Sequence, residues 1–385
     1  MTTPVLSTRL PAVGTTIFTE MSQLAAEQQA VNLGQGFPDF ACDPTLIDLV
    51  DEAMRAGHNQ YPFMTGVPAL RAAIAAKIAA LYGRTYDVNT EITVTSGASQ
   101  AIQTAILCSV HPGDEVIVIE PAYDCYAPAV ALSGGIVVPV AMRVGPEGYS
   151  VPWDAVAGAV TPRTRMIVVN TPHNPTGSIL RAADMAARGR IVEGTDILIL
   201  SDEVYEHMVF DGQQHESVSR YPGLAERAFV ISSFGKTYHV TGWKVGYVAA
   251  PAAMMAEFRK VHQYNVFTVN TPMQHGIAAY MADPAPYLGL SDFYQAKRDL
   301  FRAGLAGSRF ELLPADGTYF QCVRYNAISD LPEAEFSKWL TREAKVAAIP
   351  VSAFYSKATE SGVVRFCFAK KDETLHKALA TLSQL

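Results

Sequence analysis

The sequence lacks the patterns that point to a metal centre, a disulfide framework or a membrane protein. Its five cysteines are scattered, with no C-x-x-C pair and no zinc-ligand spacing. An odd number of dispersed cysteines is typical of reduced thiols in a cytosolic protein. No apolar run approaches the length of a membrane span, and residues 1–11 contain no apolar core of a signal peptide. We therefore expect a cytoplasmic protein with no metal site and no membrane partner.

Basic charge is also scarce. The chain has 30 lysine and arginine residues against 37 aspartate and glutamate residues, which gives a net charge of −7. This balance provides no basic surface for nucleic acid. Hydrophobic residues make up 49% of the 385 positions, enough for a large core in two domains or in one domain with a smaller satellite.

Short apolar segments alternate with helix-like segments along the first 250 residues. The apolar segments have no polar face, which favours a sheet buried on both sides, and hence a mostly parallel sheet with crossover helices. The predicted strands are 91–95, 115–119, 136–140, 166–170, 196–201, 228–232 and 245–249. Apolar spacing predicts helices over 15–29, 66–82, 98–110 and 124–132.

The pattern changes after about residue 285. Two helices beside a few strands indicate a smaller α+β domain. The predicted elements are a helix at 292–305, a strand at 318–323, a helix at 333–344 and a strand at 363–368. We predict an N-terminal arm (1–45) that packs on the small domain, a large domain (46–285) and the small C-terminal domain (286–385).

Polar residues stand where the predicted strands end, which is where α/β sheets bind ligands. Ser96, Gly97 and Ala98 open a helix whose free N–H groups suit an anion, although simple N-capping by Ser96 is the alternative. Asn174 lies between two prolines that aim its amide, unless this is only a tight turn. Asp202 ends an apolar strand, where an acid needs a cation or caps a helix.

Two basic residues are associated with apolar strands, one after a strand and one inside a strand. Lys236 lies in Ser232–Tyr247 among small and hydroxyl residues, where a lysine can form an imine with an aldehyde cofactor; a solvated loop lysine is the alternative. Arg365, inside an apolar strand, requires a carboxylate. Together these groups are the parts of a pyridoxal phosphate enzyme: a phosphate cradle, a lysine for the aldehyde, an acid for the pyridine nitrogen and an arginine for the substrate carboxylate.

At this point the sequence resembles the class I (fold-type I) pyridoxal-phosphate aminotransferases over essentially its whole length, and within them the bacterial methionine aminotransferases and the related kynurenine aminotransferases. The segments that carry the resemblance are 32–39, 59–61, 94–98, 121–126, 170–177, 201–205, 232–236 and 365–368. It implies an α/β fold of the PLP-transferase type I, with a large helix-sandwiched sheet and a smaller α+β domain.

The resemblance also implies roles for the catalytic residues Lys236, Asp202 and Tyr205. Lys236 binds the cofactor aldehyde covalently, and Asp202 pairs with the pyridine nitrogen. Tyr205 and Asn174 contact the phenolic oxygen, while Tyr123 stacks on the ring.

The remaining implied residues bind the phosphate and the substrate. The phosphate site consists of Ser96, Gly97, Ala98, Ser233 and Lys244, together with Tyr61 from the partner subunit of a homodimer with shared active sites. The substrate carboxylate is held by Arg365, Asn174 and the backbone around Gly36.

Two departures from the family pattern affect specificity. Lys244 stands where many members have arginine, so a point charge replaces a bidentate fork. Residues 269–271 occupy the region where kynurenine aminotransferases carry a histidine, which argues against a strict kynurenine preference. For Phe37, Tyr61, Phe267 and Phe354, both a place in an apolar substrate pocket and a plain core role remain open.

We therefore predict a ping-pong aminotransferase that moves the amino group of methionine and aromatic amino acids to a 2-oxo acid. The alternative is kynurenine–oxoglutarate transaminase or cysteine-S-conjugate β-lyase activity. A non-catalytic transcription regulator is disfavoured, because the chain offers neither a basic segment nor space for a DNA-binding module.

Overall fold

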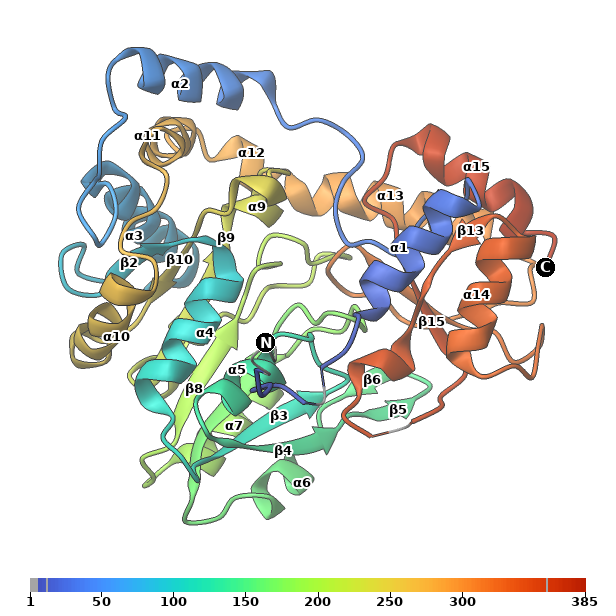
Figure 1. Cartoon of the computed structure of the whole chain (residues 1–385), viewed down its shortest axis with the longest axis horizontal. Helices are drawn as coiled ribbons and strands as arrows, with labels where there is room; N and C mark the ends of the chain where they lie inside the picture. Colours follow the sequence, from blue (N-terminus) through green and yellow to red (C-terminus); the bar gives the residue numbers. More distant parts are fainter. Residues whose placement is uncertain (1–5, 12, 358) are drawn as a thin grey trace, which may run out of the picture.

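A seven-stranded sheet forms the centre of the larger part of the molecule (Figure 1). The computed structural model describes residues 6–11, 13–357 and 359–385, so residues 1–5 and 12 of the predicted arm lie outside it. The strand order is β2-β10-β9-β8-β7-β3-β4, with β10 antiparallel to both neighbours and the other pairs parallel. The strands are β2 (Ile92–Thr95), β3 (Glu115–Glu120), β4 (Ile136–Ala141), β7 (Thr164–Asn170), β8 (Leu198–Asp202), β9 (Ala228–Ser233) and β10 (Gly246–Ala249). The predicted mostly parallel sheet is confirmed.

Helices cover both faces of this sheet, which explains why its strands have no polar face. Successive side chains of a strand point to opposite sides: Val116 and Val118 belong to one core cluster, Ile117 and Ile119 to another. On the first side lie α4 (Gly97–Ser109), α5 (Tyr126–Leu132) and α10 (Ala252–Asn265). On the second side lie α3 (Pro68–Tyr82), α7 (Ala182–Val192) and α8 (Pro222–Ala225).

Several elements escaped the sequence prediction. Among them are the helices α2 (Pro44–Arg55), α11 (Thr271–Tyr280), α12 (Ala285–Leu288) and α15 (Asp372–Leu382), and the hairpin of β5 (Arg143–Gly145) and β6 (Gly148–Ser150). The helix predicted over 124–132 begins only at Tyr126. The antiparallel direction of β10 was also not predicted, because the sequence of an all-apolar strand does not indicate whether it runs parallel or antiparallel to its neighbours.

The C-terminal part is built on a four-stranded antiparallel sheet in the order β11-β12-β15-β14. Its strands are β11 (Glu311–Leu312), β12 (Phe320–Arg324), β14 (Ile349–Pro350) and β15 (Val363–Cys367). The helices of this part are α13 (Leu290–Gly304), α14 (Glu333–Glu343) and α15. The sheet and helices match the smaller α+β unit expected beyond residue 285.

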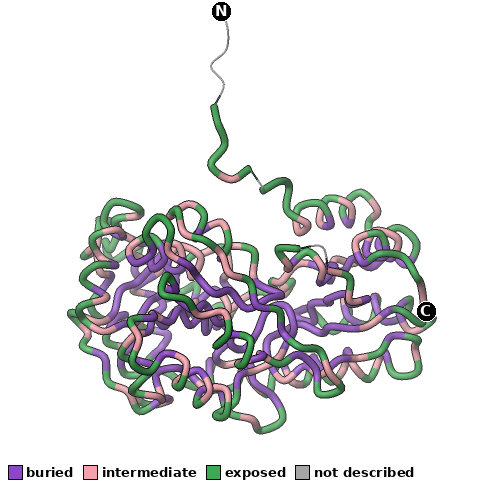
Figure 2. The backbone as a smooth tube through the Cα atoms, turned by 90° about the horizontal axis from the view of Figure 1, so that it is seen from below, coloured by how far each residue is buried: buried purple, intermediate pink, exposed green. Residues whose placement is uncertain are grey.

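The N-terminal segment reaches this C-terminal part. Helix α1 (Ile17–Glu27) lies beside α14, with Glu20 2.9 Å from Lys338, and β1 (Val31–Asn32) pairs in parallel with β13 (Val346–Ala347). The residues described before α1 are mostly exposed and project from the body (Figure 2). One core cluster joins Val204–Phe210 to side chains of the C-terminal part, so the domain boundaries near 46 and 286 stay a prediction.

Two features are absent from the described residues. No helix in residues 6–11, 13–357 or 359–385 is long and apolar enough to cross a membrane. Within these ranges there is also no group of three or more histidine, cysteine, aspartate or glutamate side chains arranged to hold a metal ion.

Candidate active site

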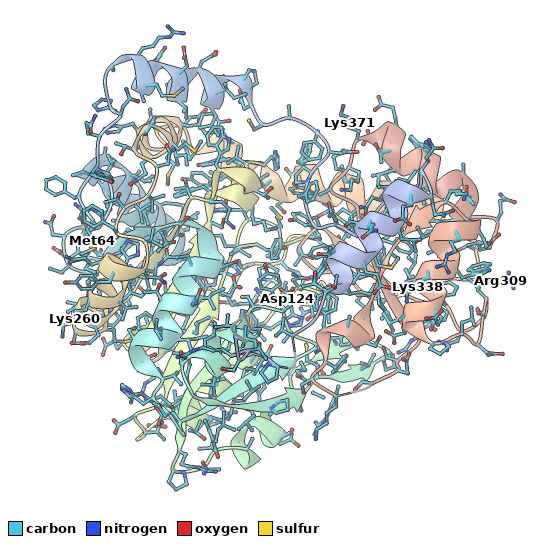
Figure 3. All side chains as sticks on the ribbon, in the orientation of Figure 1. Met64, Asp124, Lys260, Arg309, Lys338 and Lys371 are labelled. Carbon is cyan, nitrogen blue, oxygen red and sulfur yellow. The ribbon has the colours of Figure 1, made fainter. Side chains whose placement is uncertain are left out.

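A cavity of about 320 Å³ lies at the carboxyl ends of the parallel strands, closed from the other side by the C-terminal part and by α1. Every predicted site residue except Ser96 and Tyr61 lines it. Asp124, which also lines the cavity, lies near the centre of the molecule in Figure 3. The ends of β2, β7, β8 and β9 therefore converge on one cavity, as expected for a ligand site in an α/β sheet.

The N-terminus of α4 forms the cationic end of the cavity. Gly97 has φ +74°, and a Cβ atom there would lie 3.4 Å from the Lys244 Nζ atom, so the helix start and this ammonium are neighbours. The Ser96 side chain makes no capping hydrogen bond, which removes the N-cap alternative and leaves the first N–H groups of α4 free for another acceptor. Helix dipole, free N–H groups and ammonium together fit a phosphate group.

Asp202 lies at the end of β8, with 3% of its surface exposed. The Tyr126 hydroxyl donates to its Oδ2 atom at 2.7 Å, and the Val204 N–H donates to its Oδ1 atom at 3.3 Å. Burial raises the pKa of Asp202 to about 6, although these hydrogen bonds and Lys236 act to lower it. A buried carboxylate with so few donors favours a cationic partner in the cavity.

The turn after β7 is held by two asparagines. Asn170 donates through Nδ2 to the Asp202 carbonyl at 2.9 Å and accepts from the Asn174 N–H at 2.7 Å. This bond fixes the loop that carries Asn174, whose Oδ1 accepts from Arg365 Nη1 at 2.6 Å. Tyr205 and Tyr123 line the cavity nearby, and burial raises the pKa of both phenols, so both stay protonated at neutral pH.

Lys236 sits on the one-turn helix α9 (Phe234–Thr237), directly after β9. Its Nζ atom donates to the Tyr319 hydroxyl at 2.8 Å and to the Gly36 carbonyl at 3.1 Å. Burial lowers the pKa of Lys236 to about 8. An appreciable fraction of the amine is therefore neutral near physiological pH, as a nucleophile or general base requires.

Arg365 is 1% exposed and, among the residues that the structure describes, no carboxylate pairs with it. Its Nη1 and Nη2 atoms donate to Asn174 and to the Gly34 carbonyl, whereas its Nε atom has no partner in the part of the chain that the structure describes. Phe320 lies under the guanidinium at 3.9 Å. Burial lowers the pKa of Arg365, which marks an unneutralised cation prepared to receive an anion.

Some predicted residues lie elsewhere. Tyr61 is 80% exposed and lies outside the cavity, with its ring 5.3 Å from that of Phe267. Of the four aromatic candidates, Phe37 lines the cavity and Phe354 packs against the Arg365 guanidinium at 5.1 Å. The Thr271 hydroxyl donates to the Gln60 carbonyl at 2.7 Å, so segment 269–271 adjoins the Tyr61 loop.

Several side chains that contact or line the site were assigned no role from the sequence, and three of them lie beside its charged groups. They are Tyr126 on Asp202, Tyr319 on Lys236, and Asp124 in the cavity wall beside Arg365. Tyr126 and Tyr319 are 76 and 83 residues away from their partners in the chain, so no local spacing marks them. Tyr126 and Asp124 lie inside segment 121–126, one of the segments that carry the family resemblance. No other feature of the sequence indicated a role for them.

Comparisons with known proteins agree with this geometry. The chain is 51% identical to the methionine aminotransferase of Escherichia coli, covering 98% of this chain and 97% of that protein. A solved Escherichia coli structure described as having a methionine aminotransferase function superposes with a TM-score of 0.96 at 49% identity, over 100% of both chains.

The names of more distant relatives refer to other amino acids. The probable N-succinyldiaminopimelate aminotransferase DapC of Mycobacterium tuberculosis is 41% identical, over 98% of each chain. Kynurenine–oxoglutarate transaminase 1 of Rattus norvegicus is 33% identical, over 97% of this chain and 96% of that protein. The model of the family "Aminotransferase class I and II" matches residues 28–382. The chain is an aminotransferase and belongs to the class I and II aminotransferase family.

Proposed function

We propose that this aminotransferase uses pyridoxal phosphate and moves the amino group of methionine and aromatic amino acids to a 2-oxo acid. The observation that supports it best is the set of three charged groups that meet in one cavity. Lys236, Asp202 and Arg365 line it; Asp202 and Arg365 are buried, and among the described residues the Arg365 Nε atom has no hydrogen-bond partner.

These residues fit the cofactor and substrate group by group. The N-terminus of α4, Ser233 and Lys244 would hold the phosphate, and Asp202 would pair with the ring nitrogen. The orphaned Nε atom of Arg365 would receive the substrate α-carboxylate. When bound, the cofactor supplies an aldehyde for the amino group and a ring that accepts electrons.

Asp202 and Lys236 have different roles in the proton transfers. Asp202 keeps the ring nitrogen protonated, since an ionised carboxylate stabilises the cation beside it. With cofactor and substrate bound, the Lys236 amine would accept the proton of the substrate Cα atom as general base and then donate it as general acid. A 2-oxo acid runs the same steps in reverse, which gives ping-pong kinetics.

The cavity wall and the relatives support an apolar donor. Phe18, Phe37, Ile102 and Phe320 line the cavity, and no arginine other than Arg365 does so among the described residues. A second carboxylate on the substrate would therefore meet no guanidinium. The Escherichia coli relative named for methionine supports the same donor.

We also propose a cytoplasmic homodimer. Four exposed aromatic side chains belong to the loop after α2, to the C-terminal end of α10 and to the segment that follows α10: Tyr61, Phe63, Tyr264 and Phe267. A second copy of the chain would cover them and bring Tyr61 of the partner subunit to the phosphate. Sedimentation of the Tyr61→Phe variant would test the dimer. Its affinity for the cofactor would test the contact of Tyr61 with the phosphate.

A half-reaction screen tests the donor. The purified protein loaded with pyridoxal phosphate is mixed with single amino acids, and the lysine-bound cofactor absorbance between about 360 and 430 nm is followed. We expect the fastest loss with methionine, then with aromatic amino acids. Fastest loss with kynurenine would favour the alternative, and pyruvate and ammonia formed from a cysteine S-conjugate without an acceptor would reveal β-lyase activity.

A further inference from the structure

The hydroxyl of Tyr319 contacts the amine of Lys236 at a position that the proposed function leaves unexplained. Lys236 Nζ donates to this hydroxyl at 2.8 Å and to the Gly36 carbonyl at 3.1 Å, while the Tyr319 hydroxyl donates to the same carbonyl at 2.6 Å. The three groups close a ring of hydrogen bonds. Because Nζ is the donor in both of its bonds, the arrangement favours the ammonium over the neutral amine.

The backbone holds Tyr319 in place at a cost in strain. Thr318 has φ +66°, a left-handed conformation that β-branched residues rarely adopt. Its N–H donates to the Met208 carbonyl at 2.9 Å, and its Oγ1 accepts from the Phe320 N–H at 3.1 Å. At Gly317 a Cβ atom would lie 2.7 Å from the Met208 carbonyl oxygen, so this segment has no room to shift. Strain retained beside a reactive lysine points to a positioning role.

We propose that Tyr319 is a positioning residue whose hydroxyl, with the Gly36 carbonyl, docks the Lys236 amine in its protonated form whenever that amine is not bonded to the cofactor. This inference rests on the proposed function. The incoming amino acid releases the amine, which takes the α-proton: the Cα–H bond breaks, an N–H bond forms, and the electron pair passes to the cofactor ring. The two oxygens of the dock then accept the N–H bonds of the ammonium until it returns the proton to the cofactor carbon.

Competitive labelling of the full chain without cofactor tests the dock independently of the proposed function. Trace acetic anhydride is applied across a pH series, and acetylation of residue 236 is quantified on its peptide by mass spectrometry. We expect the midpoint for Tyr319→Phe to fall by about one pH unit, the effect of one lost charge-assisted hydrogen bond. Tyr319→Met carries the same expectation and serves if Tyr319→Phe does not fold.

Tyr294→Phe is the matched control. Tyr294 is buried, its ring lies 5.6 Å from that of Tyr319, and its hydroxyl has no partner among the described residues. We expect its midpoint to equal that of the unchanged chain. An unshifted midpoint in both Tyr319 variants, or an equal shift in Tyr294→Phe, would overturn the dock.

A second readout connects the dock to the reaction. In single turnovers of the holoenzyme with α-deuterated and ordinary methionine, Tyr319→Phe is expected to slow proton removal about three- to tenfold, because its lysine is the weaker base. Its isotope effect should rise above those of the unchanged chain and Tyr294→Phe. A shifted midpoint with unchanged rate and isotope effect would overturn the role in the reaction. If no amino acid changes the absorbance even of the unchanged chain, the proposed function fails, while the labelling result still decides on the dock.

Discussion

Two buried clusters of charged and hydroxyl groups lie close together in this chain, and they are built differently. In the first, which we name the Glu206 cluster, the Glu206 carboxylate accepts from Lys77 at 2.6 Å, Tyr82 at 2.5 Å, Ser232 at 2.6 Å and Tyr247 at 3.2 Å. Burial acts to raise the pKa of Glu206, but Lys77 and these hydrogen bonds hold it well below its usual value.

The second cluster is the active site, where the balance is reversed. Asp202 accepts few hydrogen bonds, and burial raises its pKa; the Arg365 Nε–H donates to no partner among the described residues. Strand β9 serves both clusters, since Ser232 donates to Glu206 while the next residue, Ser233, lines the cavity. The difference teaches that a buried carboxylate saturated by hydrogen bonds within the protein supports the structure, whereas less satisfied charges that line a cavity are placed to receive a ligand.

Removing Lys236 should have the largest effect, and it should fall on activity alone. Lys236→Ala deletes the nucleophile and proton carrier, so we expect the methionine half-reaction to slow on the order of 10⁴-fold. Its free energy of unfolding should change by less than about 1 kcal/mol, since the hydroxyl of Tyr319 keeps its bond to Gly36. Stopped-flow absorbance and urea unfolding measure the two; unimpaired turnover would contradict the assignment.

Removing Lys77 should show the opposite pattern. Lys77→Met leaves Glu206 as a buried, unpaired carboxylate, which typically costs about 3–5 kcal/mol of unfolding free energy. The folded fraction should keep its kcat, because Lys77 does not line the cavity. The double variant Lys77→Met/Glu206→Gln is the control and should recover part of the stability. A single variant that is fully stable but inactive would break the comparison.

Asp202→Asn should slow the half-reaction and raise the free energy of unfolding of the cofactor-free protein. The folded-state pKa of Asp202 is raised from 3.8 to about 6, so the burial penalty on its carboxylate is absent below pH 4 and complete above pH 6. The cofactor-free variant should therefore gain about 2–3 kcal/mol at pH 8 and nothing at pH 3.5. Its half-reaction should slow on the order of 10²–10³-fold. Urea unfolding at both pH values checks the sign, and an equal change at both would refute it.

Asp124→Asn should have the smallest effect. The Asp124 carboxylate lines the cavity and interacts electrostatically with Arg365, opposing the attraction of that guanidinium for a substrate carboxylate. Its removal should lower the KM for 2-oxo acids about two- to fivefold, as expected for a solvent-screened electrostatic interaction without direct contact. The difference should shrink in high salt. Steady-state kinetics at two ionic strengths would show it, and a raised KM would exclude this electrostatic role.

The strand ends could be predicted from the sequence because each one is a local pattern, an apolar run followed by a polar residue. This pattern marks Asn174, Asp202 and Lys236 in the sequence without any knowledge of their convergence in the fold. Tyr126 and Tyr319 reach their partners only through tertiary packing, and the direction of β10 depends on its neighbours. The number of hydrogen bonds that each carboxylate accepts also could not be predicted. Asp202 and Glu206 lie only four positions apart in the sequence, and only their hydrogen-bond partners in the fold distinguish them.

A crystal structure of the holoenzyme with an unreactive methionine analogue tests the central claim most directly. The account predicts the cofactor joined to Lys236 Nζ, its phosphate at the N-terminus of α4, and the analogue's carboxylate bonded to the Nε atom of Arg365. A carboxylate bound elsewhere, with that Nε atom still lacking a partner, would contradict the claim that unsatisfied buried charges mark the ligand site.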